Sequence, residues 1–348
     1  MVMVHNQSRA RWQQRVKNYL KRSPIVRKHL PPYAKLVHKG LQEVRTAIQD
    51  WRYPCISKQE FLADLSRALS TGTGYASGKL GYSQQQWMYY PLRIRKERDP
   101  AKLEAFRKEL LFHGLKQCGI FPASPDFYMQ FNEFYLHHVR NLDCVGICHY
   151  HPFEPEVLGH YRLTNKLTDY LNQQVDLDSP SAEGTCYLPL FRGRRILIVC
   201  PFAEVLKERA TEEIFEGVWS KAGHKKWFHP ASIEALEFPY GFSADTQRAY
   251  PDAIALFDDI VAQLRQRVFD VALIGAAGLA IPLASAVKEM GRVGMDIGGH
   301  LQLLFGVLGK RYRRWGWSAI DDNPWCINMP SQYIPKEAAE VCDQGAYW

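Results

Sequence analysis

Two turns that contain glycine follow short apolar segments in the last third of the chain, and both could bind a phosphate group. Residues 271–274 are an apolar run without a helical period, which is typical of a buried strand. Residues 279–290 predict a helix and residues 293–297 a second strand, so together they predict a parallel βαβ unit. The turn glycines are Gly275, Gly278, Gly298 and Gly299. Turns of this kind direct backbone N–H groups and a helix N-terminus beyond the strand end, where phosphate is the commonest ligand.

The same segment allows a membrane-spanning interpretation. Residues 271–287 carry no charge, but a spanning helix needs about 20 apolar residues. The residues that interrupt the run are Gly275, Gly278, Pro282 and Ser285, and Lys288 and Glu289 end it. We therefore prefer the βαβ unit.

A dinucleotide-binding oxidoreductase is another interpretation of this βαβ unit. Its fingerprint is G-x-G-x-x-G, with an acidic residue about 20 residues further on that binds the ribose. Here Ala277 breaks the glycine spacing. Asp296 nevertheless stands at about the expected separation from Gly275, so this alternative remains open.

Further strand and helix signals extend the unit to a complete α/β fold. Apolar runs predict strands at residues 142–148, 194–200 and 233–238. Capping residues, N-terminal prolines and apolar spacing predict helices at residues 57–69, 99–117, 124–140 and 252–268. We expect a Rossmann-like open, mostly parallel sheet flanked by helices. Residues 51–348 form a single domain in this interpretation, preceded by a basic helical N-terminal arm at residues 1–50.

The positive charge of the chain is concentrated in that arm. Residues 1–50 hold eleven Lys or Arg residues and two acidic ones, which accounts for the net charge of +8 of all 348 residues. Apolar residues spaced three and four apart, on both sides of Pro31 and Pro32, predict two amphipathic helices. The arm could lie on an anionic membrane surface, bind nucleic acid or cap the fold. No RNA-binding signature accompanies the charge, so we expect no nucleic-acid partner.

Cysteine and histidine patterns give little sign of a metal centre. The eight cysteines lack zinc-site spacing and predict reduced thiols. The reduced thiols and the absence of an apolar signal-peptide segment predict a cytoplasmic protein. The basic arm also allows peripheral attachment to the inner face of the membrane. His149 and His151 form an HxH pair that could bind zinc or simply line a polar surface. Asp176 and Asp178 form a DxD, a motif that often arises by chance.

The glycine turns belong to a longer pattern that resembles the C-terminal half of bacterial glycosyltransferases of the GT-D fold. The matching positions are Ile274, Gly275, Gly278, Pro282, Leu283, Asp296 to Gly299, Leu301 to Gly306 and Gly309 to Arg311. Further matches are Lys79 to Gly81, Pro201 to Glu204, and the aromatic ending from Pro335 to Trp348. The resemblance covers most of residues 57–348. The aromatic ending could form the floor of a sugar site or cover the core.

The resemblance also implies a donor-binding motif from which this chain departs. Many relatives end their N-terminal strand in RxGDGE, whose Asp and Glu are associated with a metal and the donor diphosphate. Here Lys79 and Gly81 match, but Tyr82 and Gln84 replace the two carboxylates. Divalent cations prefer anionic oxygens, so we expect no required metal cofactor, with manganese as the open alternative. Lys79 could supply the positive charge instead.

The resemblance implies that the chain transfers a sugar from a nucleotide-sugar donor to a glycan, lipid-linked glycan or glycoprotein acceptor, in surface polysaccharide biosynthesis. Donor-binding candidates are Lys79, Gly81, Tyr82, Gln84, Gly275, Gly278, Gly298 and Gly299. The acceptor hydroxyl needs a general base, and the candidates are Asp296, Glu204 and His300, in that order. Glu204 could instead complement a helix dipole. The alternatives are an NAD(P)-dependent oxidoreductase and a catalytically silent relative that binds a nucleotide-sugar or glycan.

Overall fold

The computed structural model describes residues 52–147, 154–173, 186–221, 225–310, 312 and 322–348. The chain divides into two compact units, Met1–Tyr53 and Pro54–Trp348. The predicted basic arm, the HxH pair at His149 and His151, and the DxD at Asp176 and Asp178 lie outside the described residues. The elements below all belong to the second unit.

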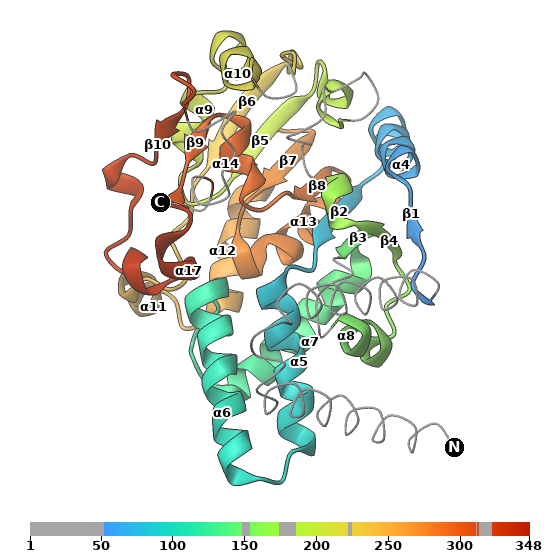
Figure 1. Ribbon diagram of the computed structural model, residues 1–348. Helices are drawn as coiled ribbons and strands as arrows, with labels where there is room; N and C mark the ends of the chain where they lie inside the picture. The colour runs from blue at the N-terminus through green and yellow to red at the C-terminus, as the bar shows by residue number, and fades with distance from the viewer. Residues whose placement is uncertain (1–51, 148–153, 174–185, 222–224, 311, 313–321) are drawn as a thin grey trace, which may run out of the picture. The chain divides into compact units, whose positions relative to one another are not determined.

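An eight-stranded parallel sheet forms the centre of this unit (Figure 1). In spatial order its strands are β1 (Cys55–Ile56), β4 (Lys166–Asp169), β3 (Cys144–Ile147), β2 (Tyr75–Lys79), β8 (Val293–Asp296), β7 (Val271–Ile274), β5 (Arg195–Val199) and β6 (Ser232–Leu236). Every neighbouring pair in this sheet is parallel. β9 (Val307–Leu308) and β10 (Ile327–Asn328) form a separate small ladder. The predicted α/β fold with an open parallel sheet is confirmed.

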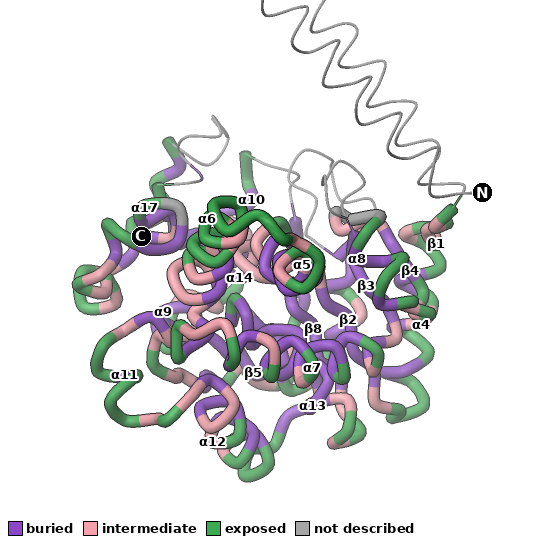
Figure 2. The backbone as a smooth tube through the Cα atoms, turned by 90° about the horizontal axis from the view of Figure 1, so that it is seen from below, coloured by how far each residue is buried: buried purple, intermediate pink, exposed green. Residues whose placement is uncertain are grey.

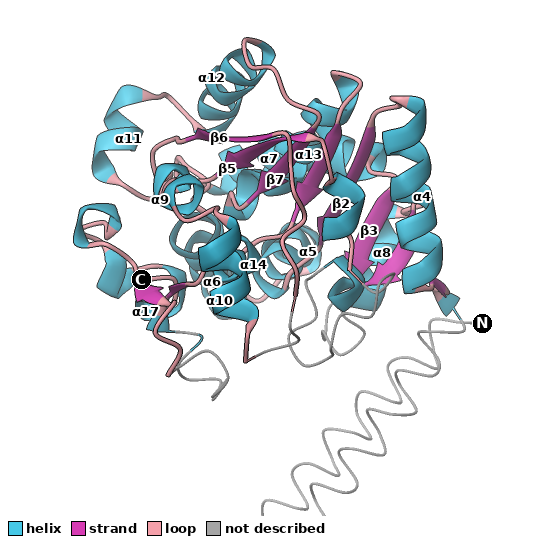
Figure 3. Ribbon diagram, turned by 90° about the horizontal axis from the view of Figure 1, so that it is seen from above, coloured by secondary structure: helices cyan, strands magenta, loops and turns pink. Residues whose placement is uncertain are grey.

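Helices cover both faces of the sheet (Figure 3). Their bounds are α4 (Lys58–Thr71), α5 (Tyr82–Lys96), α6 (Pro100–Leu111), α7 (Pro125–Asn141), α8 (Glu154–Tyr161), α9 (Ala203–Glu208), α10 (Glu212–Trp219), α11 (Ala244–Ala249), α12 (Ala253–Arg265), α13 (Ala280–Glu289), α14 (His300–Leu304) and α17 (Cys342–Gly345). A π-helix, Phe112–Gln117, continues α6. α5 and α6 lie side by side and extend away from the sheet (Figure 1).

Alternating strand residues divide the core between the two faces. Met295 of β8 joins a large apolar cluster that includes residues of α4, α9, α10 and α14. Gly294, its neighbour, faces Ala284 of α13 on the opposite side. α13 packs on β2, β7 and β8 and against α7 and α12. The central strands are buried, while exposed residues lie on helices such as α6 and α11 (Figure 2).

Most predicted helices begin where their capping residues indicate. Ser57 and Glu60 form a complete capping box at the start of α4. Ser124 caps α7 ahead of Pro125, and Asp252 caps α12. These side chains satisfy N–H groups that have no partner within the helix. The βαβ unit is also confirmed, with 3₁₀ turn Ala277–Leu279 preceding α13.

One helix at the site was not predicted. α5 begins after Gly81 in a segment that we expected to be a strand end or loop. Its sequence contains Pro91 and several tyrosines, which favour other structures locally. Burial of Trp87, Met88 and Tyr90 stabilises it as a helix, so tertiary packing overrides local preference.

The membrane-spanning interpretation of residues 271–287 is not supported. The segment forms β7, a turn and the ten-residue helix α13. Across the described residues, no helix combines the length and apolarity needed to cross a bilayer.

Candidate functional site

A cavity of about 390 Å³ opens at the carboxyl ends of β2, β8, β7, β5 and β6. Its lining includes Gly81, Cys200, Gly275 and Gly298, which follow the ends of β2, β5, β7 and β8. β5 and β7 are adjacent, but the chain leaves β5 toward β6 and leaves β7 in the opposite direction, toward β8. The strand order therefore reverses at this pair, and ligands bind at such reversal points in open α/β sheets.

The first turn of α5 forms one side of the cavity. Gly81 occupies its N-cap position, and no side chain there accepts a hydrogen bond from the helix. Tyr82, Ser83 and Gln84 all line the cavity. Backbone N–H groups of a first helical turn have no partner within their helix and carry partial positive charge. This edge of the cavity therefore suits an anion.

Lys79 places a full positive charge beside that helix start. It ends β2 and lines the cavity. Its Nζ lies 5.4 Å from the centroid of the Tyr170 ring, within range of a cation–π contact. The aromatic face thus favours a defined position for the ammonium group.

Asp296 ends the neighbouring strand β8 and supplies the one acidic side chain found among the described lining residues. Its Oδ2 accepts a hydrogen bond from the Lys79 backbone N–H at 3.3 Å, and its Oδ1 accepts one from the Gly298 N–H at 3.0 Å. Burial raises the pKa of Asp296 to about 6, and the Lys79 charge and these two N–H groups oppose that rise. A carboxyl group with this pKa can exchange protons near neutral pH.

Tyr82 and Gln84, which replace the expected carboxylates, both reach the cavity but differ in their contacts. Gln84 Nε2 donates a hydrogen bond to the carbonyl oxygen of Ala277 at 3.4 Å, which links α5 to the turn after β7. A glutamate could not donate this bond. Tyr82 is 48% exposed and meets the edge of His113 at 6.1 Å between ring centroids.

An aromatic wall also lines the cavity. Tyr240 stacks on Phe242 with ring centroids 5.1 Å apart. Trp348 meets both rings edge to face, and its Nε1 donates to the Tyr240 hydroxyl at 3.0 Å. Trp348 is buried in the core and also lines the cavity, so it confirms the predicted core-covering role of the aromatic ending, while the floor of a sugar site stays a prediction.

Eight of the eleven predicted site residues line the cavity, and three do not. The eight are Lys79, Gly81, Tyr82, Gln84, Gly275, Asp296, Gly298 and Gly299. Gly278 instead packs against Ile120 and the Cys118 carbonyl, where an added Cβ would come within 2.8 Å of that oxygen. Its smallness serves packing against the turn that follows the π-helix.

Glu204 and His300 also lie outside the lining. Glu204 is exposed, approaches Lys207 at 3.7 Å, and donates its backbone N–H to Glu237. His300 is half-buried in the first turn of α14. Strand-end position alone predicted these two as bases, but neither residue is among those that line the cavity.

Other lining residues were not predicted from the sequence. They come from the π-helix and following turn (His113, Gln117, Cys118, Gly119), from Tyr170, and from the loop after β6 (Phe238, Tyr240, Gly241, Phe242). The loops meet because Gly241 approaches Gly119 so closely that an added Cβ would lie 2.0 Å from its carbonyl oxygen. The local sequence gives no signal for this contact between the two loops, nor for the contribution of the π-helix to the cavity.

The complete arrangement is a cavity lined by a cation, a helix N-terminus, a buried carboxyl group at a strand end and aromatic rings. Such a cavity can hold a ligand that has both an anionic part and an apolar or ring-shaped part. No protein-family model, curated protein or solved structure matches this chain. The interpretation of the site therefore depends on its own geometry and chemistry.

Proposed function

We propose that this chain is a nucleotide-sugar-dependent glycosyltransferase that acts on a glycan, lipid-linked glycan or glycoprotein. The observation that supports this most strongly is the adjacency of Lys79, the start of α5 and Asp296 at the β2–β8 strand ends. A nucleoside diphosphate leaving group needs positive charge, and an acceptor hydroxyl needs a base. The resemblance to GT-D glycosyltransferases supports the same function.

In this proposal the donor diphosphate lies between Lys79 and the first-turn N–H groups of α5. Charge grows on the leaving phosphate as the glycosidic bond breaks, and these groups stabilise it without reorganising. Asp296 accepts the proton of the acceptor hydroxyl. Its pKa of about 6 leaves it ionised at neutral pH yet more basic than an exposed aspartate.

The aromatic wall of Tyr240, Phe242 and Trp348 gives the donor or acceptor a flat apolar surface. Sugar C–H faces and nucleobases both pack on aromatic rings. Surface polysaccharide biosynthesis at the inner face of the membrane is the proposed setting, with the basic arm as the membrane contact.

A binding and turnover experiment tests the function. The full chain is titrated with a panel of UDP- and GDP-sugars and with NAD, by calorimetry, with and without manganese. We expect one nucleotide-sugar to bind and NAD not to bind. Lys79→Ala should weaken donor binding by about 1.5–3 kcal/mol through loss of a charge-assisted bond.

Two further variants separate the roles. Lys108→Gln changes an exposed lysine of α6 that does not line the cavity and should bind the donor normally. Asp296→Asn should keep donor binding but lose turnover. Tight NAD binding without nucleotide-sugar binding would favour the oxidoreductase, and donor binding without turnover in the unsubstituted chain would favour a silent relative.

A further inference from the structure

A second cluster of chemically capable side chains lies away from the cavity, where α7 packs against α13. His137, His138 and Glu289 each offer one ligand atom, and these atoms all lie within 4.8 Å of one another. His137 and Glu289 are exposed, while His138 is buried. The cluster joins helices that are far apart in sequence and in contact in the fold.

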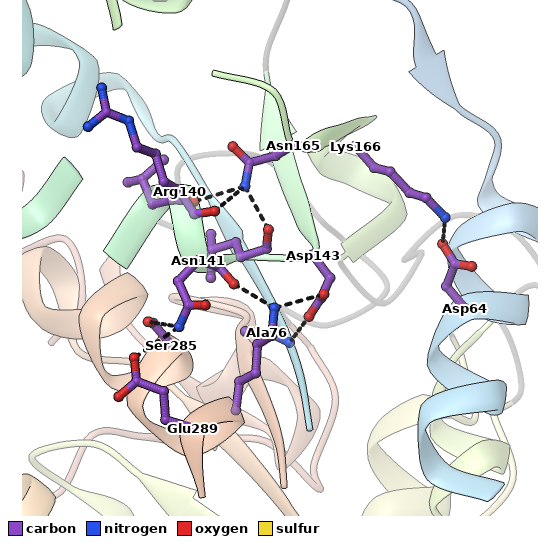
Figure 4. Close-up of polar contacts among 12 residues, drawn as sticks. Asp64, Ala76, Arg140, Asn141, Asp143, Asn165, Lys166, Ser285 and Glu289 are labelled. Atoms are coloured by element: carbon purple, nitrogen blue, oxygen red, sulfur yellow. Dashed lines mark hydrogen bonds and ion pairs between the residues drawn. The ribbon is translucent and has the colours of Figure 1, made fainter. Parts of the chain in front are cut away.

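Hydrogen bonds already orient two of these three side chains. His138 Nδ1 lies 2.9 Å from the hydroxyl of Ser285, which is fully buried. Asn141 Nδ2 donates to Glu289 Oε1 at 3.0 Å and to Ser285 Oγ at 2.9 Å. Figure 4 shows Asn141 reaching from α7 toward Ser285 and Glu289 on α13. Metal-binding imidazoles and carboxylates are held in this way by a surrounding layer of polar groups.

We propose that His137, His138 and Glu289 bind a zinc ion that joins α7 to α13. Two imidazoles and a carboxylate are a ligand set that zinc accepts, with water in the fourth position. In the tautomer whose Nδ1–H donates to Ser285, Nε2 of His138 is available to take the metal. Glu289 binds through an oxygen while Asn141 holds its carboxylate.

The spacing of the three ligand atoms suits this role. Ligand atoms around tetrahedral zinc lie about 3.3 Å apart, so the widest separation must close by roughly 1.5 Å. The exposed side chains of His137 and Glu289 can make that movement by small rotations. Imidazoles also select zinc over magnesium, which prefers oxygen ligands.

Calorimetry and melting curves on the full chain, stripped of metal with EDTA and then dialysed, test the site. Zinc chloride should bind with one strong site here and should raise the melting temperature, because a metal that binds only the folded state stabilises it. Magnesium chloride should do neither. His137→Ala and Glu289→Gln should each weaken zinc binding at least about 10–100-fold.

The variants are chosen so that folding and competing sites do not obscure the result. His137 and Glu289 are exposed, and glutamine at position 289 keeps an oxygen for Asn141, so both variants should melt normally without zinc. His160→Ala removes an exposed histidine on α8 and should leave this site intact. A His149→Ala/His151→Ala double variant removes the HxH pair and should also retain the site.

Three outcomes would overturn the proposal. The first is absence of zinc binding by the unsubstituted chain. The second is zinc affinity that does not change in His137→Ala and Glu289→Gln. The third is loss of the strong site in the His149→Ala/His151→Ala variant alone, which would place the ion at the HxH pair.

Discussion

At the scale of single residues, Asp296 is the group whose protonation most directly affects both stability and chemistry. Burial favours its neutral form, although two backbone N–H groups and the Lys79 charge favour the carboxylate. Because burial has the larger effect, the folded state binds a proton more tightly than the unfolded chain does. The protein therefore holds a charge at neutral pH that lowers its own stability, as residues at functional sites often do.

We predict that this charge can be detected as a pH-dependent difference in the free energy of unfolding between the unsubstituted chain and Asp296→Asn. The folded pKa of about 6 lies above the ordinary value of 3.8. Asp296 therefore makes its full contribution to stability when the pH is below the ordinary pKa of 3.8. This contribution is lost as the pH rises through the folded pKa of about 6. The loss amounts to about 3 kcal/mol. Asparagine does not titrate, so it shows no such loss.

Urea unfolding from about pH 4 to about pH 7 measures this difference. The free energy of unfolding of the unsubstituted chain should fall relative to that of Asp296→Asn as the pH rises. Loss of a hydrogen bond in the variant changes this difference by the same amount at every pH and does not affect the trend. Other titrating groups cancel because both proteins contain them. Curves that stay parallel over this range would contradict the raised pKa.

Tyr82 and Gln84 give a second prediction at this scale. Gln84→Glu alone should lower the free energy of unfolding by about 0.5–1.5 kcal/mol, because it replaces the donor to the Ala277 carbonyl with an acceptor. The double variant Tyr82→Asp/Gln84→Glu should gain manganese binding, since it creates two carboxylates at the start of α5. Calorimetry with manganese and the donor measures the gain. Tyr82→Asn, which adds no charge, is the control.

The same experiment examines metal dependence in the unsubstituted chain. If its donor binding is lost with EDTA and restored by manganese, the carboxylates that matter lie elsewhere. The correspondence of residues 79–84 with the relatives' motif would then be wrong.

At the scale of elements, the close approach of α13 to the sheet depends on small residues. An added Cβ at Gly294 would lie 2.5 Å from the Ala284 carbonyl oxygen. Gly294→Ala must therefore displace α13, because the backbone of a packed helix cannot rotate away as a side chain can. The free energy of unfolding should fall by at least about 3 kcal/mol. Donor binding should weaken too, because α13 carries the turn that lines the cavity.

Gly291→Ala is the matched control for this prediction. Gly291 follows α13, and an added Cβ there meets no atom within 4 Å. Gly291→Ala should lower the free energy of unfolding by about 1–2 kcal/mol, because a φ of +74° disfavours residues other than glycine. Urea unfolding should show a larger loss of unfolding free energy for Gly294→Ala than for Gly291→Ala. Equal losses would mean that α13 can move without difficulty.

The sequence predicted this βαβ unit well because its signals are local. β7 has the predicted bounds, Val271–Ile274, and the helix and second strand differ from the prediction only at their ends. The apolar run, the turn glycines and the polar stop after α13 are all readable from neighbouring residues. α5 was missed because its stability comes from burial against distant parts of the chain, which local sequence does not record.

The cavity illustrates the same division. Strand-end residues such as Lys79 and Asp296 could be predicted, since parallel strands bring their carboxyl ends to one edge. Tyr240 and Phe242 could not, because their loop reaches the cavity through the tight contact between Gly241 and Gly119. Glu204 and His300 lie near the predicted edge of the sheet but do not line the cavity, because a strand-end position does not fix which side chains reach it.

At the scale of the whole molecule, the charged arm and the α/β unit are expected to act separately. Residues 1–50 hold most of the positive charge, and the compact unit that carries the cavity begins at Pro54. A variant without residues 1–50 should bind the donor normally but should no longer float with anionic vesicles. Flotation with neutral vesicles is the control for non-specific adsorption. Undiminished flotation of the shortened chain with anionic vesicles would assign membrane contact to another surface.

The bond between the Lys79 N–H and Asp296 joins residues 217 positions apart, and this separation affects synthesis on the ribosome. β2 emerges early and pairs with β3, but its other edge stays open until β8 has been translated. At about 5–20 residues per second, that interval lasts roughly 10–40 s. An open strand edge can pair with other nascent chains. Cells that synthesise many copies of this protein at the same time should therefore rely on chaperones, which shield that strand edge until β8 has been translated.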